Sequence, residues 1–364
     1  MTRPHDCDII IPVWNQLEAT KECIDSIAKN TDYPYRLIII DNGSNDETSD
    51  YLKGFQASLG DRIILLRNNE NLGFARAVNQ GLRLSDAPYI CIMNTDTIAT
   101  AGWLSEMVSV LESHPEIGML NPSSNTSGQI PKEESIGSYA SGLKSLKGET
   151  QELYNVRGFC MLLRREAVDM VGLFDEAYGL GYFEETDYSK RAHLKGIGIA
   201  RAKAAYVYHK EETSFKEVKG RRELFLRNEE MFFRRWGRPL RVGYIVGRRG
   251  GEGKIDDIAT SVARNGHQAV ILLKKGLEWP VRLDHFDIRR VDISPALFGL
   301  VSLVRILKRK TKKKIDVLLT DDAGLGALLK MTRPLHGAHV IIKPSRESVL
   351  ALLKELKGVS EYGK

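Results

Sequence analysis

The sequence predicts an α/β protein of two domains, each with a mainly parallel sheet flanked by helices. Short runs rich in Ile, Val and Leu alternate with amphipathic stretches, which is the pattern of parallel strands joined by helices. The chain has 364 residues, more than a single hydrophobic core normally holds. Gly237 and Pro239 end a helix expected from about residue 216, so we place the domains at residues 1–237 and 238–364.

The first hundred residues predict a β-α-β-α-β-α-β unit. The expected strands are residues 8–13, 36–40, 62–66 and 89–93, and the expected helices are residues 16–29, 47–59 and 74–84. Right-handed crossovers in such a unit place ligands at the carboxyl ends of the strands.

Residues 123–151 differ in composition from their surroundings. They are rich in Ser, Gly, Lys and Glu with little periodicity, which predicts a mobile loop. Such a loop either closes over a site and excludes water or is a plain surface insertion. A strand is expected after it, followed by a smaller α/β domain. These later strands are residues 156–163, 242–246, 269–273, 315–319 and 339–342.

The second domain has a glycine-rich turn that fails two phosphate-loop patterns. Five residues separate Gly247 from Gly253 where the Walker pattern has four, and Ile255 stands where Ser or Thr would hold magnesium. The pattern GxGxxG fails as well, because Asp256 occupies the position of the third glycine.

The composition is that of a globular protein, with 42% hydrophobic and 27% charged residues. No apolar run reaches the ~18 residues of a membrane span. The first residues, MTRPHDC, lack the basic and then apolar plan of a secretory signal, so we expect a cytoplasmic protein. The four cysteines form no CxxC pair, which argues against a zinc site or a disulfide framework and predicts buried, reduced thiols.

Charge is divided unevenly along the chain. Residues 237–364 contain 25 Lys plus Arg and 13 Asp plus Glu, a net charge of +12, and the remainder carries −6. This asymmetry predicts an anionic partner for the C-terminal part. The segment from Leu297 to Lys314 is first apolar and then basic, which predicts a peripheral helix on an anionic membrane surface, at the inner face of the membrane.

Two other interpretations of this segment remain open. A core helix followed by a solvated basic loop is an equal alternative, since the apolar residues cover most of the helix circumference. A nucleic-acid partner is disfavoured, because no aromatic residues are interleaved with the lysines.

Polar residues follow three expected strands. Asp41 comes after RLIII and suits a hydrogen bond from a base N–H or a ribose hydroxyl, or it forms an Asx turn that caps the next helix. Asn94 and Asp96 follow YICIM, and a carboxylate there suits a hard divalent cation. His209 ends the strand-like residues 204–208 and is either a metal ligand or an ordinary strand-end histidine.

Three carboxylates crowd the first turn of another expected helix, in the sequence FEETDY. They are Glu184, Glu185 and Asp187. Helix capping explains them, because the helix dipole favours negative charge at this end. A general base whose pKa is set by burial and like-charged neighbours is the alternative.

Seven ordered segments together resemble the family-2 glycosyltransferases of GT-A fold, and more narrowly their rhamnosyltransferase-like branch. The resemblance covers about residues 6–236. The segments are DIIIPVWN, IIIDNGSNDET, NENLGFARAVNQG, CIMNTDT, GFCMLLRREAVDMVGLFDE, YFEETDYSKRAHLKG and YVYH. The second domain resembles the Rossmann-like N-terminal half of a GT-B glycosyltransferase, without the nucleotide-binding half, so we expect an accessory domain there.

The resemblance implies a donor site for a nucleotide-diphosphate sugar. Pro12 and Trp14 would lie along the nucleotide, and Asp41 would recognise its base. Arg76 would approach the diphosphate. Asn94 and Asp96 occupy the family's DxD position, where Asp96 would bind Mg²⁺ or Mn²⁺ with His209 as a further ligand. Asn94 replaces the first acid of DxD, which leaves one carboxylate fewer for the metal.

The resemblance also implies an inverting, metal-dependent single displacement onto a glycan, lipid-linked or protein acceptor, as in polysaccharide biosynthesis. Glu185 matches the position of the catalytic base, where the family usually has Asp. We expect Glu184 and Asp187, which flank it, to line the acceptor side together with Gly158 and Phe159.

Two other function classes remain. A non-catalytic GT-A module that binds nucleotide sugars or partner proteins would also tolerate Asn94 and Glu185. A nucleotidyltransferase shares the strand-end carboxylates but requires a basic glycine-rich loop after the first strand, and PVWNQLEAT has none.

Overall fold

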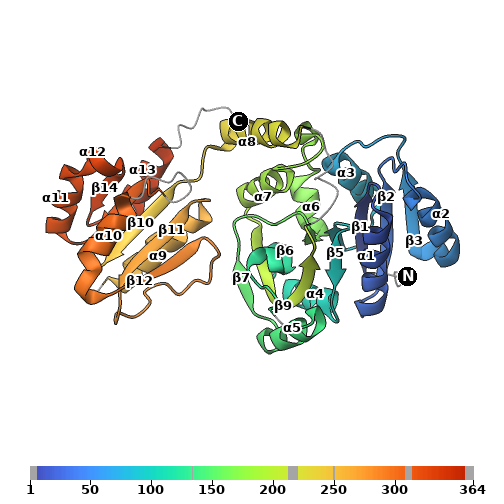
Figure 1. Ribbon diagram of the computed structural model, residues 1–364, viewed down its shortest axis with the longest axis horizontal. Helices are drawn as coiled ribbons and strands as arrows, with labels where there is room; N and C mark the ends of the chain where they lie inside the picture. Colours follow the sequence, from blue (N-terminus) through green and yellow to red (C-terminus); the bar gives the residue numbers. More distant parts are fainter. Residues whose placement is uncertain (1–5, 133, 212–219, 249–250, 308–313, 357–364) are drawn as a thin grey trace. The chain divides into compact units, whose positions relative to one another are not determined.

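The computed structural model describes residues 6–132, 134–211, 220–248, 251–307 and 314–356 (Figure 1). The chain divides into two compact units, residues 1–230 and 231–364, which are described separately. Helix α8 (Arg221–Trp236) contains this division, and the sequence-based domain limits stay a prediction.

In the described part of the first unit, nine strands form one mixed sheet. Along the main path the order is β3-β2-β1-β4-β8-β6-β9-β5, and β7 pairs with β9 off this path. Strands β1 to β4 are mutually parallel, β6 is parallel to β9, and β5, β7 and β8 run antiparallel to their neighbours. The strands are β1 (Cys7–Val13), β2 (Tyr35–Asp41), β3 (Ile63–Arg67), β4 (Tyr89–Met93), β5 (Thr97–Ala99), β6 (Ile117–Ser123), β7 (Thr150–Glu152), β8 (Cys160–Arg164) and β9 (Gly198–His209).

Helices cover both faces of this sheet because its central strands are apolar on both sides. Ile9 and Ile11 of β1 join one buried cluster with side chains of α1, α2 and α4. On the opposite face, α3 approaches β1 so closely that a Cβ at Gly81 would lie 2.4 Å from Ile10 Cγ2. The helices are α1 (Leu17–Asn30), α2 (Thr48–Leu59), α3 (Phe74–Leu84), α4 (Trp103–Ser113), α5 (Ile136–Gly142), α6 (Arg165–Val171) and α7 (Glu184–Leu194).

The sheet confirms the expected α/β class, and the expected elements of the first hundred residues are present. Two later predictions need correction. Residues 123–151 contain α5 and the start of β7, because Ser135 caps α5 through Ser138 N (3.2 Å). Strand β8 begins at Cys160 rather than at Val156, because Asn121 binds the backbone of Arg157 and holds this part as a loop.

The second unit is a smaller Rossmann-like domain, with one sheet between two layers of helices. Its five described strands are all parallel, in the order β12-β11-β10-β13-β14. Helices α9 and α13 pack on one face of the sheet, and α10 and α11 pack on the other. The elements are β10 (Arg241–Val246), α9 (Glu252–Arg264), β11 (Gln268–Lys274), β12 (Ile288–Ile293), α10 (Phe298–Leu307), β13 (Val317–Thr320), α11 (Ala323–Met331), α12 (Arg333–His336), β14 (His339–Ile342) and α13 (Arg346–Leu356).

The apolar half of the proposed membrane segment forms α10. Ser302 and Ile306 are buried, and Ile306 belongs to the core of the second unit, while Val304 is 49% exposed. Most of the basic half, residues 308–313, lies outside the described residues. In the part of the chain that the structure describes, no helix is long and apolar enough to cross a membrane. Contact with a membrane surface therefore stays a prediction.

All four cysteines are buried in the first unit as free thiols. Burial raises the pKa of Cys23 to about 12, and it raises the pKa values of Cys7 and Cys91 well above the ordinary thiol range. The Sγ atoms of Cys91 and Cys160 lie 4.0 Å apart on adjacent strands.

Candidate active site

Asp96 and His209 meet at one edge of the first sheet. Asp96 directly precedes β5, His209 ends β9, and the antiparallel ladder places Thr97 opposite His209. Asp96 Oδ1 lies 3.1 Å from His209 Nε2. The ring of Phe159 stacks on the imidazole at a centroid distance of 5.1 Å, and Asn125 binds both backbone groups of His209. The imidazole orientation is therefore set by a stacked ring, a backbone clamp and a carboxylate.

This pair suits a divalent cation that also binds a ligand. The side chains of Asp96 and His209 are 13% and 17% exposed, so both remain open to solvent. Among the described residues, no group of three His, Cys, Asp or Glu side chains converges as a metal site. A carboxylate oxygen and an imidazole nitrogen match the donor preferences of Mn²⁺, with the other positions left for water and phosphate oxygens. Asn94, two residues earlier, donates its backbone N–H to the Phe159 carbonyl (2.8 Å).

Asp41 is buried at the carboxyl end of β2. Its Oδ1 accepts a hydrogen bond from Ser44 N (2.9 Å), three residues on, but the next helix, α2, begins only at Thr48, so Asp41 does not cap it as the alternative expected. Its Oδ2 pairs with Arg67, which stands opposite Asp41 in the parallel ladder of β2 and β3. Sequence reasoning missed Arg67, although an arginine at the end of the apolar run IILLR was a visible signal.

The loop after β1 lies beside the Asp41 turn. Asn15 N donates to Ser44 Oγ (2.9 Å), and Asn15 Oδ1 accepts from Asn45 N (2.9 Å). These bonds join the carboxyl ends of the parallel neighbours β1 and β2. Pro12 and Trp14 are partly exposed on this side, where the sequence predicted the nucleotide.

Glu184 and Glu185 begin α7 in different surroundings. Glu184 is buried, and its Oε2 has no hydrogen-bond partner. Burial, and then the charge of Glu185, raise the pKa of Glu184 well above its ordinary value. Burial also raises the pKa of Glu185, but two backbone N–H groups and the charge of Arg157 oppose this rise. Glu185, which is partly exposed, is therefore the member of the pair that we expect to ionise first.

The loop of residues 157–159 links Glu185 with the Asp96–His209 pair. A Cβ built on Gly158 would lie 3.9 Å from Glu185 Cγ, so a side chain there would enter the space beside the carboxylate. The next residue, Phe159, is buried with its ring stacked on His209. One short loop thus lies beside Glu185 at Gly158 and stacks on His209 through Phe159.

Residues 8–172 match the family model described as Glycosyl transferase family 2. This stretch is a family-2 glycosyltransferase domain. With the sheet in which β1 to β4 are parallel, the match assigns the first unit to the GT-A fold class. The matched range includes Asp41, Asn94 and Asp96 but ends before Glu185 and His209, whose roles depend on the geometry above.

Curated relatives of the glycosyltransferase domain share part of their length with it. A PGL/p-HBAD biosynthesis glycosyltransferase of Mycobacterium bovis is 32% identical over 107 residues, which are 29% of this chain and 41% of the relative. An uncharacterized glycosyltransferase of Haemophilus influenzae is 32% identical over 109 residues, which are 30% of this chain and 33% of the relative. The chain therefore spans well under half the length of these relatives.

Solved glycosyltransferases resemble the structure more distantly. The mannosyltransferase PcManGT from Pyrobaculum calidifontis, solved with GDP-Man and Mn²⁺, is 17% identical with a TM-score of 0.47, covering 63% of this chain and 65% of that protein. GalNAc-T7, solved with UDP, GalNAc and Mn²⁺, is 14% identical with a TM-score of 0.49, covering 62% and 48%. Because both TM-scores lie below 0.5, the family assignment depends on the sequence match and not on these two structures.

Two of the predicted site residues, Arg76 and Asp187, pair with other side chains of the first unit. Arg76 lies on α3, and its Nε donates to Glu176 Oε2 (3.1 Å). Asp187 is fully buried, and its Oδ2 accepts from Arg191 Nε (2.8 Å). Arg191 stands one turn later on α7, and the Tyr178 hydroxyl lies 3.5 Å from the other oxygen of Asp187, so its place on the acceptor side stays a prediction.

Asn228 of α8 holds the loop before the two glutamates, and sequence reasoning missed it. Its buried Nδ2 donates to the carbonyl oxygens of Tyr178 (2.8 Å) and Gly181 (2.7 Å), with a longer bond to that of Tyr182 (3.2 Å). The loop ends with Tyr182 and Phe183 at φ 72° and 75°. This left-handed backbone conformation is unfavourable for residues other than glycine. Asn228 thus stabilises a strained entry into α7.

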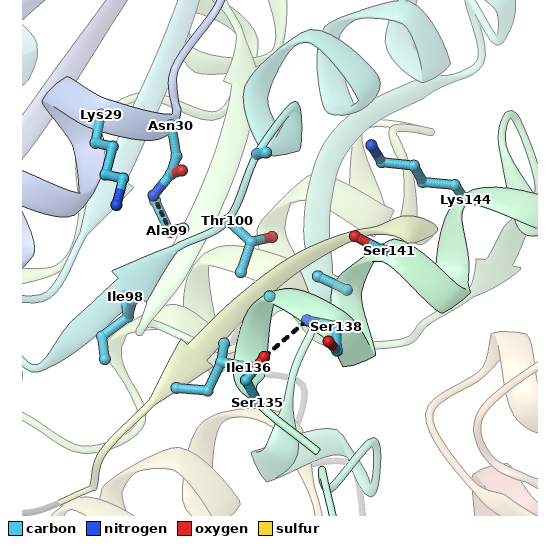
Figure 2. A pocket seen from close by; sticks show the side chains of 13 residues that line it. Lys29, Asn30, Ile98, Ala99, Thr100, Ser135, Ile136, Ser138, Ser141 and Lys144 are labelled. Atoms are coloured by element: carbon cyan, nitrogen blue, oxygen red, sulfur yellow. Dashed lines mark hydrogen bonds between the residues drawn. The ribbon is translucent and has the colours of Figure 1, made fainter.

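A cavity of about 610 Å³ also lies in the first unit, apart from all of these residues (Figure 2). Its lining comes from the end of α1, from the stretch that follows Asp96 along β5, and from α5. Lys29 and Lys144 lie on opposite sides of it, and Thr100, Ser138 and Ser141 contribute hydroxyl groups.

Proposed function

We propose that the chain transfers a sugar from a nucleotide-diphosphate donor to a hydroxyl group of an acceptor, with inversion at the anomeric carbon. The observation that supports this best is the loop of residues 157–159, in which Gly158 lies beside Glu185 and Phe159 stacks on His209. A base and a metal-binding pair on either side of one loop suit a single displacement.

The donor would bind along the carboxyl ends of β1, β2 and β4. Trp14 and Pro12 would contact the nucleotide, and its base would lie beside the turn after β2, where Ser44 N and Arg67 bind the two oxygens of the Asp41 carboxylate. Asp96 and His209 would hold Mn²⁺ or Mg²⁺. When bound, the cation would neutralise charge on the departing diphosphate.

Glu185 would act as the general base. The acceptor oxygen forms a bond to the anomeric carbon, while the bond from that carbon to the diphosphate oxygen breaks. The acceptor proton passes to the Glu185 carboxylate, and the bonding electrons leave with the nucleoside diphosphate. Burial keeps the pKa of Glu185 above its ordinary value, which makes the carboxylate a better proton acceptor.

The acceptor would approach from the side of Gly158, where the missing side chain leaves space beside Glu185. A glycan, a lipid-linked sugar or a protein glycan each presents the hydroxyl group that the reaction needs. Sugar transfer to a lipid-linked acceptor would require the chain to bind at the inner face of a membrane. The transfer would then be a step of polysaccharide biosynthesis.

Glu185→Gln tests the proposal, with Glu18→Gln on the exposed surface as the matched control. We expect the transfer rate to fall by about 10²–10⁴ in Glu185→Gln. Donor binding, measured by calorimetry in the presence of Mn²⁺, should remain as in wild type. Unchanged biological function in Glu185→Gln would instead support the non-catalytic module that binds nucleotide sugars or partner proteins.

A further inference from the structure

The second unit contains a cavity of about 530 Å³ at the carboxyl ends of β10 and β13. This volume lies within the range of small-molecule sites, about 300–1,000 Å³. All of its lining belongs to the second unit. Its lining includes Arg248, Lys254, Phe298, Thr320, Asp321 and Asp322.

The cavity lies where the strand order of the sheet reverses. From β10 the chain adds β11 and β12 on one side, and it then returns to add β13 and β14 on the other side. Between β10 and β13 the connecting helices therefore leave in opposite directions. Open α/β sheets bind their ligands in this crevice, outside the carboxyl ends of the strands.

The two carboxylates in the cavity already have protein partners. Asp321 accepts from Lys254 Nζ (2.6 Å) and from the Tyr244 hydroxyl (2.6 Å). Burial opposes ionisation of Asp321, but these two hydrogen bonds, together with the charges of Lys254 and Lys343, lower its pKa. Asp322 accepts from Leu325 N (2.9 Å), which caps α11, and from Arg248 (3.2 Å).

The cations keep hydrogen-bond donors to spare. An ammonium group has three N–H donors and a guanidinium has five, and the side-chain contacts above use one from Lys254 and one from Arg248. The buried hydroxyl of Thr320 accepts from Asp322 N (3.2 Å) and lines the same cavity. The surplus of donors at the polar end favours an anionic ligand.

The start of α9 adds to this preference. Its N-cap is Gly251, at φ 79°, a residue without a side chain to cap the helix. The N–H groups in the first turn of a helix favour phosphate. The residues from 237 to 364 also carry a net charge of +12, which attracts anions to the unit as a whole.

The other wall of the cavity is apolar. The ring of Phe298 covers the end of β10 so closely that a Cβ at Gly247 would lie 3.1 Å from its Cε1. Leu325 lines the same cavity. A flat apolar group would pack against this wall, and the carboxylates of Asp321 and Asp322 retain lone pairs for ligand hydroxyls.

We propose that this cavity binds an organic phosphate of nucleotide size. The phosphate lies at Arg248, Lys254 and the start of α9, and the flat part packs on Phe298. This site is separate from the donor site of the first unit, and the proposal does not depend on glycosyl transfer.

The test is calorimetry of the full chain in EDTA with UDP, ADP and inorganic pyrophosphate. The variants are Lys254→Met, Phe298→Ala and Asp96→Ala, with Lys354→Met on α13 as a control that removes the same charge outside the cavity. We expect UDP or ADP to bind with a stoichiometry of one molecule per chain in wild type, Lys354→Met and Asp96→Ala. Lys254→Met should weaken binding at least tenfold, and Phe298→Ala should weaken nucleotide binding more than pyrophosphate binding.

Three results would overturn the proposal. Nucleotide binding that is lost in Asp96→Ala and unchanged in Lys254→Met belongs to the first unit. Equal affinity for pyrophosphate and nucleotides would show that the apolar wall does not contribute to binding. Absence of binding by all three probes removes the site. Since Lys254→Met leaves the first unit unaltered, sugar transfer should continue in that variant, and the two proposals fail separately.

Discussion

Asp96 Oδ1 lies 3.1 Å from His209 Nε2, although 113 residues separate these two side chains in the chain. The antiparallel pairing of β5 with β9 creates this contact. The pair supplies two ligands at most, so a cation bound there would depend on the donor diphosphate for further oxygen atoms.

Asp96→Ala and His209→Ala should each abolish the metal dependence of donor binding. We expect affinity for the cognate nucleotide-diphosphate sugar with Mn²⁺ to fall at least tenfold in both variants, because each removes one of two protein ligands. Calorimetric titration of a donor panel with and without Mn²⁺ measures this. Asp50→Ala, an exposed aspartate on α2, is the control. Equal metal-dependent affinity in wild type and Asp96→Ala would exclude this metal site.

Arg157→Leu should move the acidic limb of the pH profile to higher pH. Glu185 must be deprotonated to act as a base, so kcat/KM rises as pH passes its pKa. Arg157 lowers that pKa against the effect of burial, and its removal lets the pKa rise further. Arg83→Leu, an exposed arginine of α3, removes the same charge elsewhere. An acidic limb that stays in place would show that Glu185 does not control it.

Glu184→Gln should stabilise the fold at alkaline pH. The folded-state pKa of Glu184 is raised, so between the unfolded and folded pKa values the folded state binds more protons. The stability of wild type therefore falls as pH rises through this interval, and glutamine avoids the loss. Thermal unfolding at pH 4 and pH 8 checks this: the advantage of the variant in Tm should be small at pH 4 and larger at pH 8. A difference in Tm that does not change with pH would contradict the raised pKa of the buried Glu184 carboxyl.

Asn228→Ala should lower both stability and turnover. The change leaves the buried Gly181 carbonyl without its Asn228 donor and leaves the Tyr178 carbonyl only the longer bond from Arg227 Nη2 (3.2 Å), at a cost of about 1–3 kcal/mol. Relaxation of Phe183 toward ordinary φ values would turn the start of α7 and displace Glu185. We expect kcat to fall more than the affinity for donor, measured at a temperature where the variant is folded. Asn155→Ala, at an exposed loop position, serves as control, and a loss of stability with unchanged kcat would limit Asn228 to a structural role.

The elements that sequence patterns located best are those with continuous apolar runs. Strands β1 to β4 and helix α3 agree with the expectation because burial on both faces leaves a clear run or period. Strand β12 was missed because it is an edge strand in which Arg289 and Arg290 are exposed, and such a sequence resembles a loop.

Individual site residues were visible in the sequence, but their partners were not. Asp96 and His209 each follow from a strand-end position, whereas their contact requires the pairing of β5 with β9. Asn228 stands in the charged helix RRELFLRNEEMFFRRW, where nothing in the pattern distinguishes a buried amide from an exposed one. Arg67 becomes a partner of Asp41 only through the register of β2 and β3.

The four buried thiols have a practical consequence for spectroscopy. A maleimide reacts with an exposed thiolate, and the native cysteines are inaccessible, three of them with raised pKa values. One cysteine introduced at a surface position of each unit would therefore take up a fluorophore pair in the otherwise unaltered chain. The separation of the two units, and its response to donor or phosphate ligands, then becomes measurable by energy transfer.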